Sequence, residues 1–175
     1  MDKRIVKLEY KEYKNFFNLE ECNELINNFK ENVPHHEAFR DTIVLRLEKV
    51  APRLERIPWL VQGSPAPLKL ERIPLKLIRT LQKDFNITLN YSQIVHWPNG
   101  SFMKRHCDSV PGNNFTSLCY LNDNFKGGRT LFQHKNSNPK MGKVLVFNGE
   151  KIEHGVEKVI GDRFTYISWW KKNNE

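Results

Sequence analysis

From Ile87 onward the chain consists of short segments in which apolar and polar residues alternate, separated by Gly, Asn, Asp and Pro. Alternation with a period of two is typical of strands, because successive side chains point to opposite faces. The separating residues are those that favour turns. We expect seven strands, at about 87–97, 102–108, 115–122, 129–133, 143–148, 152–157 and 163–170. Many short strands in succession predict a β-sandwich or β-barrel.

The first 86 residues have a different pattern, which predicts helices and loops. Asn18 is a suitable N-cap, and Glu20 and Glu21 follow in the first turn, where acidic side chains are favourable. Apolar residues then recur at intervals of three and four, which predicts one buried helix face; they are Leu19, Cys22, Leu25, Ile26 and Phe29. The helix is expected to pack its apolar face into the core.

Two further helices are expected before the strands begin. A second periodic run covers Ile43 to Leu54, and a third covers Leu75 to Phe85 with Pro74 at its start. The segment between them, 57–74, contains four prolines and Trp59, and it predicts a loop or an extended hairpin. Whether that segment covers a substrate is left open by the sequence.

His106 and Asp108 are the first candidate functional pair. Residues two apart on a strand point to the same face, so both side chains can contact one ion while Cys107 points away. His154, from a distant strand, would complete a set of two imidazoles and one carboxylate. Such a set leaves one side of the metal open, and it is the coordination pattern of non-haem Fe(II) oxygenases. The alternative is that these histidines are ordinary surface or core residues.

Arg163 lies nine residues after His154, in a run that alternates like a strand as far as Trp170. Arg163 and Thr165 would therefore share one face. A planar guanidinium beside a hydroxyl group suits a bound carboxylate. The alternative for Arg163 is an ordinary solvated arginine.

The region from Tyr91 to Trp170 resembles the prolyl 4-hydroxylase-like Fe(II)/2-oxoglutarate dioxygenases. Besides the His-x-Asp pair, the distal histidine and the arginine, three further stretches resemble that family in the same order: 116–122 with Tyr-Leu-Asn, 126–132 with Gly-Gly-x-Thr-x-Phe, and 139–147 with Pro-x-x-Gly-x-x-x-x-Phe. The resemblance implies an α+β fold, with a double-stranded β-helix (a cupin-like jelly roll) supported by N-terminal helices.

The resemblance also implies roles for individual residues. His106, Asp108 and His154 would bind Fe(II), and these ligands together with Arg163 would form the catalytic set. Tyr120, Arg163 and Thr165 would bind the distal carboxylate of 2-oxoglutarate, with Trp169 near the same cosubstrate. The second cosubstrate would be dioxygen, and ascorbate would be a compatible reductant.

The approach to His106 departs from the family pattern. Relatives often have tyrosines where this chain has Trp97 and Met103. We expect Met103 to be a packing residue and Trp97 to shape the pocket without donating a hydrogen bond.

The resemblance implies hydroxylation, with prolyl residues of peptides or proteins as the leading substrate. A free amino acid or small metabolite and a nucleobase are the alternative substrates. A non-catalytic cupin-like binding module is the alternative outside enzymes. The chain is expected to be one domain, 1–175, in which 1–86 provide support and 87–170 form the β-rich catalytic core.

Composition limits the partners and the compartment. The net charge is +8, with 16 basic and 13 acidic residues before Tyr91 and 12 and 7 from Tyr91 onward. A basic chain allows a nucleic-acid partner, but the lysines are scattered rather than clustered. No apolar run is long enough to span a membrane, so no membrane partner is expected. Three cysteines without paired spacing favour a reducing compartment, and we expect a cytoplasmic protein.

Overall fold

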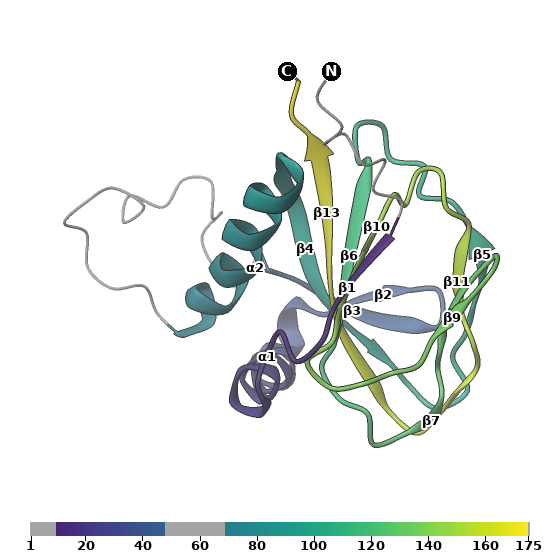
Figure 1. The fold of residues 1–175 in the computed structure, drawn as a ribbon. Coiled ribbons are helices and arrows are strands. Elements are labelled where there is room, and N and C mark those ends of the chain that lie inside the picture. Colours follow the sequence, from purple (N-terminus) through teal and green to yellow (C-terminus); the bar gives the residue numbers. More distant parts are fainter. Residues whose placement is uncertain (1–9, 48–68, 175) are drawn as a thin grey trace.

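The computed structural model describes residues 10–47 and 69–174, and it consists mainly of antiparallel sheets with two α-helices (Figure 1). The large sheet has seven strands in the order β1-β10-β6-β13-β4-β3-β2. Its strands are β1 (Tyr10–Tyr13), β2 (Glu37–Phe39), β3 (Thr42–Arg46), β4 (Ile87–Trp97), β6 (Phe115–Tyr120), β10 (Val144–Phe147) and β13 (Arg163–Lys172). The small sheet has the order β5-β11-β8-β9 and is formed by β5 (Met103–His106), β8 (Thr130–Phe132), β9 (Asn136–Ser137) and β11 (His154–Val156). A two-stranded sheet pairs β7 (Lys126–Gly127) with β12 (Val159–Ile160).

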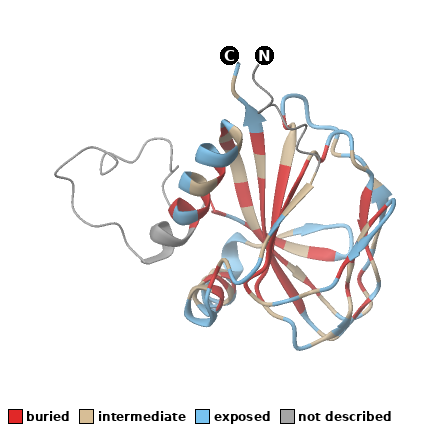
Figure 2. Cartoon of the chain, in the orientation of Figure 1, coloured by how far each residue is buried: buried red, intermediate tan, exposed pale blue. Residues whose placement is uncertain are grey.

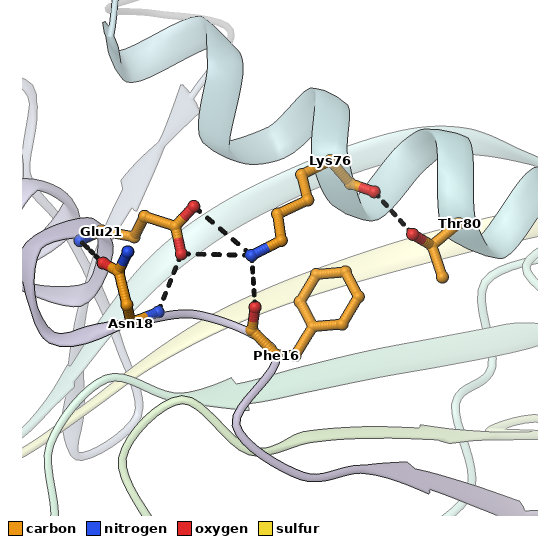
Figure 3. Close-up of polar contacts among 5 residues, drawn as sticks. All are labelled: Phe16, Asn18, Glu21, Lys76 and Thr80. Atoms are coloured by element: carbon orange, nitrogen blue, oxygen red, sulfur yellow. Dashed lines mark hydrogen bonds and ion pairs between the residues drawn. The ribbon is translucent and has the colours of Figure 1, made fainter.

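Helix α1 (Leu19–Glu31) begins with a capping box. The Asn18 side chain accepts from the backbone N–H of Glu21, and the Glu21 carboxylate accepts from the backbone N–H of Asn18. Lys76 of α2 (Lys69–Phe85) contacts the same carboxylate at 3.3 Å and donates to the carbonyl oxygen of Phe16 (Figure 3). This lysine therefore joins the start of α1 to α2.

The two helices cover one face of the large sheet, and the small sheet faces the other (Figure 1). One core lies on the helix side and includes Leu25, Leu81, Ile94 and Trp170. A second core lies between the sheets and includes Val95, Leu118, Phe147 and other apolar residues. Figure 2 shows buried residues along the strands of the large sheet, whereas the outer surfaces of the helices are exposed. The space between the sheets is where the candidate site lies.

The seven strands expected after Ile87 are all present, and the jelly-roll expectation is confirmed by the sheet topology. The strand expected at 102–108 is shorter, because β5 ends at His106. The first helix is confirmed too, with Cys22, Leu25 and Phe29 buried, although Leu19 is 60% exposed.

The expected helix from Ile43 to Leu54 is wrong where the structure describes it. Residues Thr42–Arg46 form β3, which pairs with β4 in the register Val44↔Val95. The β-branched residues Ile43 and Val44 suit a strand, and the burial of both faces hides the alternation. Residues 48–54 of that run lie outside the described residues.

The loop expected at 57–74 is wrong at its C-terminal end. Helix α2 begins at Lys69, so Pro74 lies inside the helix rather than at its start. Trp59 and the other residues of 57–68 lie outside the described residues. Within 10–47 and 69–174, neither helix is both long and apolar enough to cross a membrane.

Candidate metal and cosubstrate site

His106 and His154 are direct partners in the antiparallel pair of β5 and β11. Their ring centroids are 4.6 Å apart. Asp108 follows the end of β5, and its Oδ1 lies 3.7 Å from Nε2 of His106 and 3.6 Å from Nε2 of His154. The three ligand atoms all lie within 4.8 Å of one another, and this is the one such group of three among the described residues. The structure thus brings together the three residues that the sequence nominated.

Both imidazoles have the orientation that a metal ligand requires. Nδ1 of His106 lies 3.0 Å from the carbonyl oxygen of Lys104, and Nδ1 of His154 lies 2.8 Å from that of Ile152. A carbonyl oxygen only accepts, so each Nδ1 carries a proton and Nε2 is the nitrogen that faces the candidate metal position. Backbone carbonyls commonly fix metal-binding histidines in this way.

The Asp108 carboxylate is oriented by two other segments. Its Oδ2 accepts from the hydroxyl of Thr116 on β6, and its backbone N–H donates to the carbonyl oxygen of Gly149 at 2.8 Å. Burial opposes ionisation, but contacts with His154, Thr116 and His106 outweigh it, so the pKa of Asp108 is lowered. The group is an anion at neutral pH, as a metal ligand must be.

Arg163 begins β13 and is completely buried. Among residues 10–47 and 69–174, none of its three guanidinium nitrogens has a hydrogen-bond partner. The guanidinium carbon lies over the ring of Trp97, 4.8 Å from its centroid. Burial lowers the pKa of Arg163 to about 10, so the side chain remains cationic at neutral pH. A buried cation without a hydrogen-bonded partner is costly, and an anionic ligand would remove that cost.

The residues around Arg163 supply hydroxyl groups. Tyr120 on β6 is directly opposite Thr165 on β13, and both side chains are buried. The Tyr120 hydroxyl lies 2.6 Å from that of Thr130. Trp97 donates from Nε1 to the Thr165 hydroxyl at 3.1 Å, so the expectation that Trp97 does not donate is wrong. The predicted cosubstrate residues Tyr120, Arg163 and Thr165 therefore form one buried group.

Trp169 lies six residues from Arg163 on the same strand, beyond this group. Its ring stacks on Tyr91, with centroids 4.6 Å apart and planes 17° apart. It lines the same pocket as the three candidate metal ligands. The structure places Trp169 in the pocket wall, at the end near Thr116, which is its partner on β6.

The pocket has a volume of about 500 Å³ and extends from the His-Asp-His group to the β2–β3 hairpin. Trp97 and Thr130 line it, and the guanidinium of Arg163 lies over the ring of Trp97. His96 points to the helix side, where it stacks on Phe164 and contacts Asp162 at 2.7 Å. Sequence reasoning missed Thr116 and Gly149 as neighbours of Asp108, because neither belongs to a local motif.

Comparisons with known proteins agree with this geometry. Residues 92–171 match the model of the 2OG-Fe(II) oxygenase superfamily. Among curated proteins, no sequence matches the chain. Solved structures with a similar fold include the viral collagen prolyl hydroxylase of Paramecium Bursaria Chlorella virus-1 in its 2OG complex. Its TM-score is 0.63 at 16% identity, with 94% of this chain and 96% of that chain covered.

Two further solved structures with a similar fold contain different bound molecules. A prolyl hydroxylase from Trichoplax adhaerens, in complex with a peptide fragment of the hypoxia inducible factor oxygen degradation domain, has a TM-score of 0.70 at 16% identity, covering 93% of this chain and 83% of that chain. HygX from Streptomyces hygroscopicus, with nickel, 2-oxoglutarate and hygromycin B bound, has a TM-score of 0.66 at 13% identity, covering 94% and 83%. At these identities the likeness establishes the fold alone.

The family model and the site point to the same chemistry. The matched residues include both candidate histidines, Asp108 and Arg163, and the structure gathers the histidines and the carboxylate into a group suited to one metal ion. Residues 92–171 belong to the 2OG-Fe(II) oxygenase superfamily, and the chain is a 2-oxoglutarate-dependent dioxygenase.

Proposed function

We propose that this dioxygenase hydroxylates prolyl residues in peptides or proteins, with His106, Asp108 and His154 as the Fe(II) ligands and Arg163 as the anchor of 2-oxoglutarate. The observation that carries the cosubstrate assignment is the buried guanidinium of Arg163, whose three nitrogens have no hydrogen-bond partner in the part of the chain that the structure describes. It lies over the ring of Trp97, and Trp97 lines the pocket that contains the three ligands.

The donor set fits the proposed metal. Two imidazole nitrogens and one carboxylate oxygen, all within 4.8 Å of one another, suit the facial arrangement of non-haem Fe(II) sites. Iron(II) with 2-oxoglutarate and dioxygen supplies the oxidation that converts a C–H group of the substrate to C–OH. The protein holds these groups in position and excludes water, which is what a protein contributes to cofactor chemistry.

We assign the far carboxylate of 2-oxoglutarate to the buried group around Arg163. The guanidinium would make a charge-assisted contact, with the Thr165 hydroxyl as an additional donor. The Tyr120 hydroxyl, which donates to the carbonyl oxygen of Ser137, would turn its hydrogen to the carboxylate. Thr165 already accepts from Trp97, so its own hydrogen is available to donate. Trp169 is proposed as part of the pocket wall beside the cosubstrate.

The shape of the pocket supports a peptide substrate. Phe39 and Val110 line its outer part and are 52% and 48% exposed. Together with the stacked rings of Tyr91 and Trp169, they provide an apolar surface that suits a prolyl ring. Two of the neighbouring folds described above belong to prolyl hydroxylases.

A small-molecule substrate is the second candidate, because the similar fold of HygX holds hygromycin B. The ion pair between Glu37 and Arg46, with a distance of 3.2 Å, lines the same pocket and could contact a polar ligand.

Succinate release with Fe(II) and 2-oxoglutarate tests the proposal. The purified protein would be assayed with proline-containing peptides, free amino acids, an aminoglycoside and oligonucleotides, and products would be examined by mass spectrometry for one added oxygen. We expect peptide-dependent succinate with oxygen on proline, and no succinate from His154→Ala. Turnover with free amino acids or the aminoglycoside alone would instead select the small-molecule candidate.

We also propose that the chain functions as one domain in the cytoplasm. Cys22, Cys107 and Cys119 are all free thiols, which suits a reducing compartment. The first 86 residues contribute β1, β2 and β3 to the large sheet, so the supporting segment and the catalytic strands share one sheet.

A further inference from the structure

Asp108 differs from the two histidines in how it is held. His106 and His154 lie on paired strands, but Asp108 lies two residues beyond the end of β5. Strand pairing therefore does not fix its side chain. Its position depends on contacts from elsewhere in the chain, which are the Thr116 hydroxyl and the Gly149 carbonyl.

We propose that Thr116 is a positioning residue for the metal site: its hydroxyl holds Oδ2 of Asp108 and thereby presents Oδ1 to the ion. This inference rests on the proposed roles of His106, Asp108 and His154. The geometry is divided between the two carboxylate oxygens. Oδ2 accepts from Thr116, whereas Oδ1 faces Nε2 of both histidines.

Thr116 is well suited to this task because it cannot easily move. Its side chain is only 4% exposed. Its strand, β6, is paired on both sides, with Phe147 of β10 and Trp169 of β13 opposite Thr116. A β-branched side chain also has few rotamers in a strand. The hydroxyl is thus a fixed donor in the wall of the pocket.

Gly149 completes the arrangement from the other side. An ideal Cβ atom on Gly149 would overlap both Oδ2 of Asp108 and the hydroxyl oxygen of Thr116. The hydrogen-bonded pair therefore occupies the space that a side chain at 149 would fill. The backbone of Gly149 also accepts from the Asp108 N–H at 2.8 Å.

The consequence concerns how many oxygens reach the metal. With Oδ2 engaged by Thr116, Asp108 offers one oxygen to the ion, and the remaining coordination positions are left for 2-oxoglutarate and dioxygen. Without the hydroxyl, the carboxylate is free to rotate or to offer both oxygens. Mutation of a residue that hydrogen-bonds to a metal ligand typically lowers metal affinity by about 10- to 100-fold.

The test compares Thr116→Val, which has the same shape without the hydroxyl, with Thr116→Ser, which keeps the hydroxyl. Mn(II) affinity would be measured by titration without cosubstrate or substrate, and the visible absorption of the Co(II) protein would report its coordination. Ser117→Ala is the matched control, since it removes a hydroxyl that accepts from Trp170 on the opposite face of the same strand.

We expect Thr116→Val to weaken Mn(II) binding by at least about tenfold and to change the Co(II) spectrum, with Thr116→Ser close to wild type and Ser117→Ala unchanged. Wild-type Mn(II) affinity in Thr116→Val, or an equal loss in Ser117→Ala, would overturn the inference. If the wild-type protein itself bound no Mn(II), or bound it equally well as His154→Ala, the proposed metal site would fail instead.

Discussion

His106 and His154 lie directly opposite each other across the β5–β11 pair, with Nε2 of each ring within 3.7 Å of the same oxygen of Asp108. Residues that are 48 positions apart in sequence are thus joined by strand pairing, which fixes the distance between two candidate ligands before any metal binds. Each ring is also held by a backbone carbonyl from its own segment. A site prepared in this way loses little conformational entropy when it binds an ion.

The first prediction concerns His106. His106→Ala should abolish succinate release and remove the increase in Tm that Mn(II) gives the wild-type protein, because two ligands hold the ion poorly. A ligand at 100 times its Kd stabilises a protein by about 2.7 kcal/mol, so the effect is measurable by thermal unfolding. His35→Ala is the control, since His35 is exposed in the short 3-10 helix Val33–His35. An equal Mn(II) response in His106→Ala and wild type would contradict the assignment.

The second prediction concerns the affinity for 2-oxoglutarate. Arg163→Ala should weaken binding by about 10- to 100-fold, which corresponds to the loss of one charge-assisted contact. Arg163→Lys should recover only part of it, because an ammonium group cannot make a bidentate contact. Titration of the Mn(II)-loaded protein measures both. Wild-type affinity in Arg163→Ala would show that the cosubstrate binds elsewhere.

The third prediction separates the effect of Arg163 on the stability of the protein from its role in binding the cosubstrate. The charged guanidinium is buried with no hydrogen-bond partner among the described residues, and its pKa is lowered to about 10 by burial. A base with a depressed pKa in the folded state reduces stability at every pH below that value, since the charged form is preferred in the unfolded chain. Arg163→Met, which fills the space without a charge, should therefore raise Tm in the absence of cosubstrate.

The same variant should show no further rise in Tm when 2-oxoglutarate is added. Unfolding curves with and without the cosubstrate at pH 7 provide both readings. A lower Tm for the cosubstrate-free Arg163→Met protein would mean that the guanidinium has a stabilising partner.

The β-rich half of the fold could be predicted because its alternation and turn residues are local signals. The earlier half was harder. Residues 42–45 are buried or half-buried on both faces of β3, so their sequence lacks a period of two and its spacing predicts a helix instead. Tyr10–Tyr13 was not predicted as a strand either, because its pairing with β10 depends on residues more than 130 positions away.

In the candidate site, too, some residues could be predicted from local sequence patterns and others could not. His106, Asp108, His154 and Arg163 could be nominated because their spacing follows a family pattern. The Thr116 hydroxyl and the absent side chain of Gly149 could not, since they meet Asp108 only in the folded chain. The donation from Trp97 to Thr165 was missed for the same reason: it joins two paired strands.

The fourth prediction concerns Gly149, which has no side chain. Gly149→Ala should displace the carboxylate of Asp108, because the added Cβ overlaps Oδ2 and the Thr116 hydroxyl. The overlapped atoms are the ends of side chains, so rotation of Asp108 relieves the overlap without unfolding the protein. We expect a normal circular dichroism spectrum but Mn(II) affinity reduced by at least about tenfold. Unchanged Mn(II) affinity would show that the loop at 149 adapts.

The last prediction distinguishes a peptide from a nucleic acid. A polynucleotide would need several contacts between basic side chains and phosphates, and each contact makes binding more sensitive to salt. The apolar outer part of the pocket, with Phe39 and Val110, suits an extended peptide that is bound with few charges. We therefore expect the KM for a proline peptide to change by less than about threefold between 50 and 200 mM salt, whereas binding through six or more phosphates would weaken by about a thousandfold or more.

Phe39→Ser should raise the KM for the peptide without affecting Mn(II) or 2-oxoglutarate affinity, because Phe39 lies on the edge strand β2, away from the metal ligands. Steeply salt-dependent turnover with oligonucleotides, and none with any proline peptide, would reverse the choice of substrate.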